Sequence, residues 1–167
     1  MAFVIPEGLH ESLYPLAWII GNWHGNGIGE FPNVPQFHFE HDVTFNHDGR
    51  DFLTYFSQSW ITDAEHNRVQ QAAAETGFWR VRPNNVIEAV ICHSMGISEG
   101  WVGRFDANAR IQLAFDQGYS SPSSKVVDGG QRLYGLVEGE LFTSYDMAAN
   151  GHDLQAHTWS SLARQPQ

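Results

Sequence analysis

Residues 37–60 read FHFEHDVTFNHDGRDFLTYFSQSW, and their first nine positions alternate between apolar and polar side chains. The apolar set shares one face of an extended chain: Phe37, Phe39, Val43 and Phe45. Asp48-Gly49 supplies turn chemistry, because glycine tolerates the positive φ angles of tight hairpins. Residues 51–60 then return as a second strand. The stretch therefore predicts a β-hairpin.

Similar alternation, with turn residues between, recurs along the rest of the chain. It predicts strands at 76–82, 86–94, 99–105, 110–115, 131–139, 140–148 and 154–163. The only helical expectation is one or two turns at 9–14, limited by Pro15. Residues 116–131 are rich in Gly, Ser and Asp, which predicts a loop or a poorly ordered stretch.

Many short strands without a long helical pattern predict an all-β chain, either an antiparallel barrel or a sandwich. Periodicity alone does not distinguish the two. We favour a closed barrel, because closure removes exposed strand edges and can enclose a small ligand. No repeat or linker divides residues 1–167, so we expect one domain.

Charge and cysteine content narrow the class of protein. The 19 acidic and 9 basic residues give a formal net charge of -10, which disfavours nucleic acid and anionic membrane surfaces as partners. Cys92 is the only cysteine, so an intrachain disulfide is excluded. The longest apolar run near the N-terminus, residues 16–20, is too short to span a bilayer. We expect a soluble cytoplasmic protein.

A GxWxGxG motif opens the first strand, with Gly21, Trp23, Gly25 and Gly27 at its fixed positions. We expect Trp23 to plug one end of the barrel. The glycines allow a tight bend and close approach of a neighbouring backbone. The motif predicts the fold more than it predicts a ligand.

Catalytic and metal-binding patterns are weak. The nine histidines include no HExxH, and His38 and His41 should point to opposite faces of one strand. Cys92 and His93 are adjacent and should point apart. Three carboxylates give no evident acid–base pair: Glu75, Glu88 and Glu99.

The C-terminal strand contains His157, which alternation places on the same face as Gln155 and Trp159. Leu154 and Leu162 fall on the other face. Both faces are mixed, so periodicity does not decide which one looks inward. A lone histidine in a strand is more often a structural residue than a ligand.

Four blocks, in order, resemble the nitrobindins, a family of haem-binding β-barrels also described as peroxynitrite isomerases: LYPLAWIIGNWHGNGIGEFP at 13–32, VTFNHDG at 43–49, ETGFWRVRP at 75–83 and YDMAANGHDLQAH at 145–157. The resemblance implies a barrel of about ten strands with a short 3₁₀ helix at one end. It also implies that haem b lies at the barrel mouth, with His157 as the single proximal ligand.

The resemblance further implies reversible binding of nitric oxide and isomerisation of peroxynitrite to nitrate, with ferric iron as the Lewis acid. Haem, nitric oxide and peroxynitrite are then the partners. Three positions depart from the family pattern: Asn33 replaces a threonine near the haem, Met95 precedes Gly96 in place of threonine, and Trp159 follows His157 and Thr158. Trp159 would narrow the haem site if it faced inward.

Two other functions remain open on the sequence. One is a barrel that binds a fatty acid or other small apolar ligand without haem, with His157 as an interior structural residue. The other is a nitric oxide carrier or sensor without turnover. The sequence does not name the hydrogen-bond partner of His157 or the oligomeric state.

Overall fold

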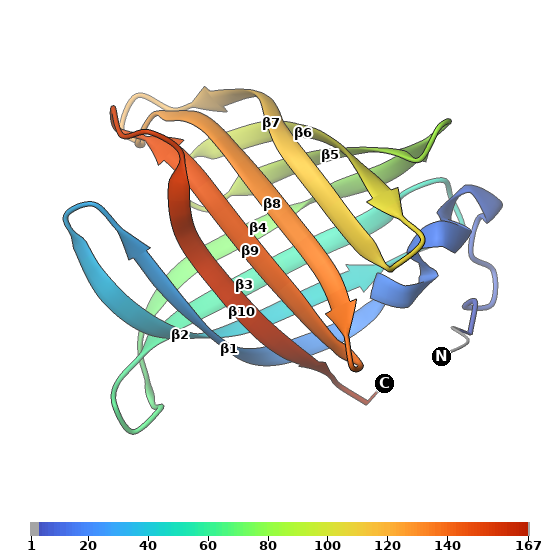
Figure 1. Ribbon diagram of the computed structural model, residues 1–167, viewed down its shortest axis with the longest axis horizontal. Coiled ribbons are helices and arrows are strands. Elements are labelled where there is room, and N and C mark those ends of the chain that lie inside the picture. The colour runs from blue at the N-terminus through green and yellow to red at the C-terminus, as the bar shows by residue number, and fades with distance from the viewer. Residues whose placement is uncertain (1–3, 167) are drawn as a thin grey trace.

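The computed structural model describes residues 4–166, so the first three residues and the last one of the expected domain lie outside the described residues. One 3₁₀ helix, η1, precedes ten strands (Figure 1). The elements are η1 (Glu11–Ile19), β1 (Gly21–Phe31), β2 (Val34–Asn46), β3 (Leu53–Thr62), β4 (Arg68–Arg82), β5 (Val86–His93), β6 (Ile97–Asp106), β7 (Arg110–Ser120), β8 (Val127–Val137), β9 (Glu140–Ala149) and β10 (Gln155–Arg164).

The strands form a closed antiparallel barrel, in which each strand pairs with the next one along the chain. Closure is made by β1 and β10, whose register runs from Trp23 opposite Arg164 to Gly29 opposite Thr158. The all-β class, the strand count and the preference for a barrel over a sandwich are confirmed. Within the described residues, no helix has the length and apolar character needed to cross a membrane.

The helix differs from the predicted one. It begins at Glu11 and continues past Pro15 to Ile19 instead of ending before the proline. The residues after Pro15 remain helical because burial holds them: Leu16, Trp18 and Ile19 are all buried. The apolar run thus serves as the plug of the barrel end and not as an exposed helix.

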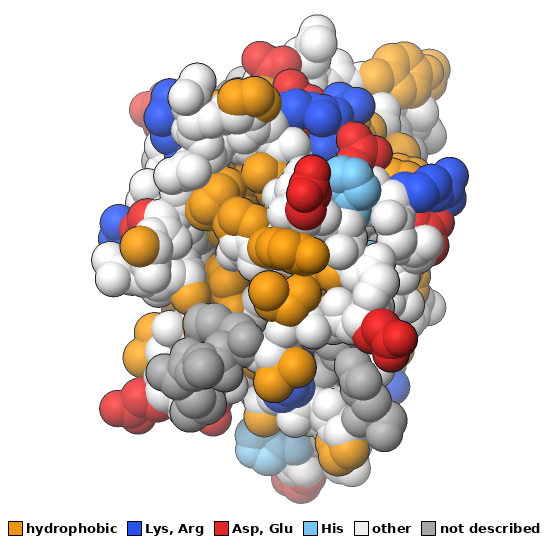
Figure 2. Space-filling model, turned by 90° about the vertical axis from the view of Figure 1, so that its right-hand side faces the viewer, with side chains coloured by type: hydrophobic (Ala, Val, Ile, Leu, Met, Phe, Trp, Pro, Cys, Tyr) orange, Lys and Arg blue, Asp and Glu red, His pale blue; other side chains and the backbone are white. Residues whose placement is uncertain are grey.

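Trp23 joins this plug to the barrel, as the sequence predicted. Its side chain is 1% exposed, and the indole Nε1 donates a 2.8 Å hydrogen bond to the Ile19 carbonyl. The Arg164 guanidinium lies 4.1 Å from the Trp23 ring and donates to the Trp18 and Ile20 carbonyls. The carbonyls at the end of η1 are therefore satisfied by side chains. Figure 2 shows this end of the molecule, with hydrophobic side chains at its centre and charged ones around them.

The motif glycines permit the barrel seam to close. A Cβ atom on Gly25 would lie 2.0 Å from the Ser161 carbonyl oxygen, and one on Gly27 would lie 2.4 Å from the Phe39 ring. Both distances are far below van der Waals contact, so any side chain here would separate β1 from its neighbours. The structural interpretation of the GxWxGxG motif is confirmed.

The predicted loop at 116–131 is wrong in extent. Strand β7 continues to Ser120 and β8 begins at Val127, which leaves residues 121–126 as the connection. The prediction treated glycine as a sign of a loop, but glycine is needed here for packing. A Cβ on Gly130 would lie 2.7 Å from the Trp101 ring. Gly130 is a strand residue that makes room for a buried tryptophan.

The interior is divided along the barrel axis. Near η1 it is filled by an aromatic cluster, in which the ring of Trp79 lies 5.0 Å from those of Phe45 and Tyr134. The opposite end lies on the side of the β1–β2 hairpin in Figure 1, and the side chains there line an open space. This half contains the cavity described next.

Candidate functional site

A cavity of about 340 Å³ occupies the half of the barrel opposite η1. Its volume lies within the range of small-molecule sites, roughly 300–1,000 Å³. Apolar side chains from three strands and one turn form much of its wall: Val34, Phe37, Phe39, Met95, Ile97 and Val127. The cavity is also lined by many polar side chains, most of which fall into three groups.

The first group centres on His157, which lines the cavity from β10. The register between β10 and β9 shifts here, since Ala156 pairs with Asp146 and Thr158 pairs with Tyr145. His157 is therefore the extra residue of a β-bulge. A bulge re-aims a side chain, and it allows His157 and the following Thr158 to line the same cavity.

The surroundings of His157 fix its ring and its protonation. Nδ1 lies 3.0 Å from the Glu30 carbonyl oxygen, an acceptor, so Nδ1 carries the proton in the neutral ring. Phe31 and Tyr145 pack edge-on against the imidazole, with centroids 5.5 and 5.8 Å away. Burial lowers the pKa of His157, although the hydrogen bond to Glu30 opposes this shift. The neutral ring thus leaves Nε2 unprotonated, and Nε2 makes no hydrogen bond within the described chain.

This geometry meets the requirements of a metal-binding imidazole. Such a ligand needs one unprotonated nitrogen and a partner that holds the other N–H. The backbone carbonyl of Glu30 is the partner that the sequence did not name. His157 therefore has the chemistry that a ligand to haem iron would require.

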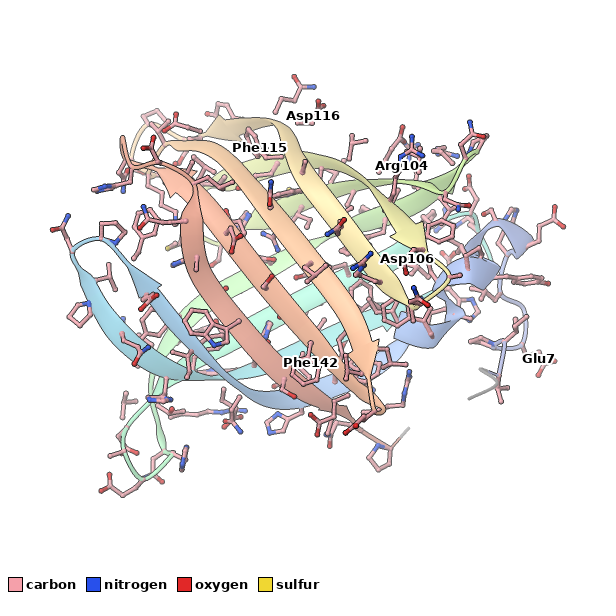
Figure 3. The ribbon with its side chains drawn as sticks, viewed as in Figure 1. Glu7, Arg104, Asp106, Phe115, Asp116 and Phe142 are labelled. Carbon is pink, nitrogen blue, oxygen red and sulfur yellow. The ribbon has the colours of Figure 1, made fainter. Side chains whose placement is uncertain are left out.

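Trp159 does not face the cavity. The bulge interrupts the alternation that placed it on the face of His157, and it lies 37% exposed on the outside of the barrel. It shares an outer groove with Ile28 and Phe142, and Figure 3 shows the Phe142 side chain on the outer side of the strands. The predicted shared face is wrong, and the narrowing of the site by Trp159 is excluded.

The other two departures from the family pattern fall in different places. Asn33 lies in the β1–β2 turn with φ of 68°, a conformation that asparagine tolerates better than most residues. It is exposed and is not among the residues that line the cavity, whereas its neighbour Val34 is. Met95, in the β5–β6 turn, does line the cavity.

The second polar group is an ion pair at the cavity floor. Arg132 from β8 donates to Glu75 from β4 through both terminal nitrogens, at 2.8 and 3.0 Å. Tyr55 donates to the same carboxylate at 2.9 Å. Burial alone would raise the pKa of Glu75, but Arg132, His93 and Tyr55 lower it to about 2. Glu75 is therefore ionised at neutral pH.

His93 connects this pair to a second carboxylate. Its Nε2 donates to Glu99 at 2.9 Å, and its Nδ1 lies 3.4 Å from Glu75. Glu99 is 2% exposed and also accepts from the Trp101 indole at 3.1 Å. The sequence showed no evident acid–base pair among Glu75, Glu88 and Glu99, and it did not show that His93 lies between two of them, Glu75 and Glu99. The missing information was register: Glu75 lies directly opposite His93, and its alternation with Trp79 indicates that it points inward.

The third polar group is a chain of hydroxyls around His41. Nε2 lies 2.8 Å from the Ser57 hydroxyl and Nδ1 lies 2.9 Å from that of Ser160. Burial lowers the pKa of His41 to about 4, against the opposing charge of Glu75. His38, in contrast, is exposed on the outer face. The predicted opposition of His38 and His41 is confirmed, as is that of exposed Cys92 and cavity-lining His93.

A grouping of possible metal ligands lies outside the cavity. Within residues 4–166, three such side chains come together only at His24, Glu40 and Asp42. Arg68 already pairs with Glu40 and lies 3.7 Å from Asp42. One of the two negative charges of this group is therefore balanced by the guanidinium of Arg68.

Comparison with known proteins gives a consistent result. Residues 12–164 match the model of the THAP4-like, heme-binding beta-barrel domain. A "Peroxynitrite isomerase" from a Nocardioides species is 41% identical over 165 residues, which covers 99% of this chain and 100% of the relative. A "Ferric nitrobindin-like protein" from Streptomyces griseus is 41% identical over 161 residues, covering 96% of this chain and 85% of that protein. The crystal structure of Rv2717c from M. tuberculosis superposes with a TM-score of 0.85 at 31% identity, over 95% of this chain and 99% of that one.

Proposed function

Because this chain belongs to the family of THAP4-like haem-binding β-barrel domains, we propose that it binds haem b through His157, binds nitric oxide there, and isomerises peroxynitrite to nitrate. The observation that carries the proposal is the hydrogen bond from His157 Nδ1 to the Glu30 carbonyl. This hydrogen bond leaves Nε2 without a proton, so the lone pair of Nε2 is available to bind a metal. His157 lines the cavity. The names of the relatives support the reaction assigned to it.

The reaction requires no proton transfer from the side chains of the cavity. A bound ferric haem supplies a Lewis-acidic iron that polarises an oxygen of the substrate. Conversion of peroxynitrite to nitrate is an isomerisation, so no atom, electron or proton is gained or lost. No general acid or base is required among the cavity residues.

The protein orients the His157 ring and excludes water from the cavity. Phe31 and Tyr145 hold the His157 ring from its edges, so the direction of Nε2 is set before the cofactor arrives. The apolar walls at Phe37, Phe39 and Ile97 exclude solvent and keep reacting fragments together.

The alternative of a fatty-acid barrel is less well supported. A fatty-acid carboxylate that reached the floor of the cavity would need a free cation at the floor. The guanidinium at the floor, Arg132, is already engaged on both terminal nitrogens by Glu75. Binding of a lipid carboxylate at this position would have to break that pair.

The test is a haem titration of the purified haem-free protein, followed by absorbance. The wild type should develop a saturable Soret band at one haem per chain, and His157→Ala should lose or strongly alter it. His152→Ala is the matched control, because His152 packs on Phe31 at 5.6 Å but does not line the cavity. The control should bind haem like the wild type.

Peroxynitrite decay and nitrate yield are then measured with catalytic amounts of loaded protein. Accelerated decay with nitrate as the product supports the enzyme. Nitric oxide binding without accelerated decay would support a carrier or sensor instead. No Soret band in any variant would overturn the haem assignment, and a co-purified lipid would then favour the apolar-ligand alternative.

A further inference from the structure

Lys125 is the only lysine of the chain, and it lies on the wall of the cavity that His157 lines. It belongs to the short connection between β7 and β8. This connection is fastened to the β5–β6 turn, since the Ser121 amide donates to the Gly96 carbonyl at 2.9 Å. Lys125 is therefore carried by an anchored segment.

The ammonium of Lys125 lacks an oxygen partner. Its Nζ lies 3.2 Å from the Met147 sulfur, which is a weak acceptor. Within the described residues it has no carboxylate at salt-bridge distance. Burial lowers the pKa of Lys125, although Glu99 and Glu75 act in the opposite direction from further away. A half-buried cation without a counterion is stabilised by any anion that can reach it.

The other cation on the cavity wall does not compete for such an anion. Arg132 is buried and donates twice to Glu75. The charge of Lys125 also contributes to the lowered pKa of His157, so the two side chains interact electrostatically within one compartment. The chain as a whole carries a net charge of -10, which repels anions at long range. A cation on the cavity wall offsets this repulsion for an anionic substrate.

We propose that Lys125 recruits and positions the anionic substrate: its ammonium holds a small monovalent oxyanion, peroxynitrite in the reaction and nitrate as its product, in the cavity that His157 lines. This proposal rests on the function proposed above. It makes Lys125 a positioning and specificity-determining residue. The iron ligand remains His157.

The single lysine gives a direct probe. Reductive methylation with ¹³C-formaldehyde labels Lys125 and the α-amino group only, and Lys125→Met identifies which signal is which. Sodium nitrate is then titrated into haem-loaded and haem-free protein, with methanesulfonate holding the ionic strength constant. The Lys125 methyl signal should shift saturably with nitrate in the loaded protein. An unchanged signal would overturn the proposal.

The haem-loaded protein also shows whether the anion that pairs with Lys125 is the substrate or a carboxylate of the cofactor. If haem alone shifts the Lys125 signal and abolishes the response to nitrate, the lysine pairs with a haem carboxylate and the proposal is wrong. If the wild type takes up no haem, the proposed function fails. The nitrate titration of the haem-free protein then still decides whether Lys125 binds an oxyanion.

Kinetics provide the second arm. Lys125→Met should lower the second-order rate constant for peroxynitrite by at least about tenfold and weaken its dependence on ionic strength. Haem affinity and the Soret band should stay unchanged. Lys125→Arg keeps the charge and should retain most of the rate. A full rate in Lys125→Met would contradict the assignment.

Discussion

Arg132 and Glu75 lie on strands that are not neighbours, β8 and β4, yet two hydrogen bonds of 2.8 and 3.0 Å join them across the barrel interior. The pair forms the floor between the aromatic cluster and the cavity. Trp101 and Tyr145 flank the guanidinium, with ring centroids 4.8 and 4.5 Å from its central carbon. A buried pair with such geometry sets the shape of the cavity as well as contributing to stability.

Loss of one partner should be far more damaging than loss of both. Arg132→Met leaves Glu75 buried without its cation, and breaking a buried pair in this way costs about 3–5 kcal/mol of unfolding free energy. The double variant Arg132→Met/Glu75→Gln removes the stranded charge and should recover a large part of that loss. Urea denaturation of the wild type, both single variants and the double variant measures the coupling. Additive losses in the cycle would show that the two side chains act independently.

Acid should destabilise the protein in two steps with separate causes. The pKa of His41 is about 4 in the folded chain against an ordinary value of 6.5. Between these values only the unfolded chain binds the proton, so stability is complete above pH 6.5 and falls as the pH drops to 4. The loss from His41 is at most roughly 3 kcal/mol. The pKa of Glu75, about 2 against 4.5, has the same sign and acts between pH 4.5 and 2.

The variant His41→Gln tests the first step. It can keep hydrogen bonds to Ser57 or Ser160 but does not titrate, so its unfolding free energy should change less than that of the wild type between pH 6.5 and 4.5. Part of the slope will remain, because burial also lowers the pKa of His157. Below pH 4, where His41 is protonated in the folded and the unfolded chain, the two proteins should lose stability in parallel. Equal slopes in the upper range would rule out His41 as the cause.

Sequence patterns predicted the barrel because their signals are local. The alternation of residues 37–45 depends only on neighbouring residues, and Trp23 needed only its motif. The tight turn predicted at Asp48-Gly49 is wrong in length, because residues 47–52 connect β2 to β3. The sequence patterns did not show the bulge at His157 or that Gly130 belongs to a strand, because both features depend on contacts with other strands. For the same reason Glu75, His93 and Arg132 were not recognised as one cluster. The resemblance to a known family pointed to His157, whereas its hydrogen-bond partner, the Glu30 carbonyl, follows from how β10 lies against the end of β1 in the fold.

Glycine positions in the barrel should differ sharply in their tolerance of alanine. Gly25→Ala places a Cβ 2.0 Å from the Ser161 carbonyl oxygen at the β1–β10 seam. Overpacking of this kind costs about 1–3 kcal/mol or more, because backbone has to move. Gly135 is the matched control within β8: it has no atom within 4 Å of its virtual Cβ and no positive φ. Thermal or urea unfolding should show a large loss for Gly25→Ala and almost none for Gly135→Ala.

The bulge at His157 makes two adjacent residues respond oppositely to substitution. Thr158 lines the cavity beside His157, whereas Trp159 lies on the outer surface. Thr158→Trp should therefore fill part of the haem site and weaken haem binding more than about tenfold. Trp159→Ala removes a larger side chain but should leave haem affinity within about twofold of the wild type, because no cavity contact is lost. Both affinities are read from the same Soret titration, with circular dichroism to verify folding. The reverse order of effects would mean that the strand follows simple alternation through His157 and that Trp159 faces inward.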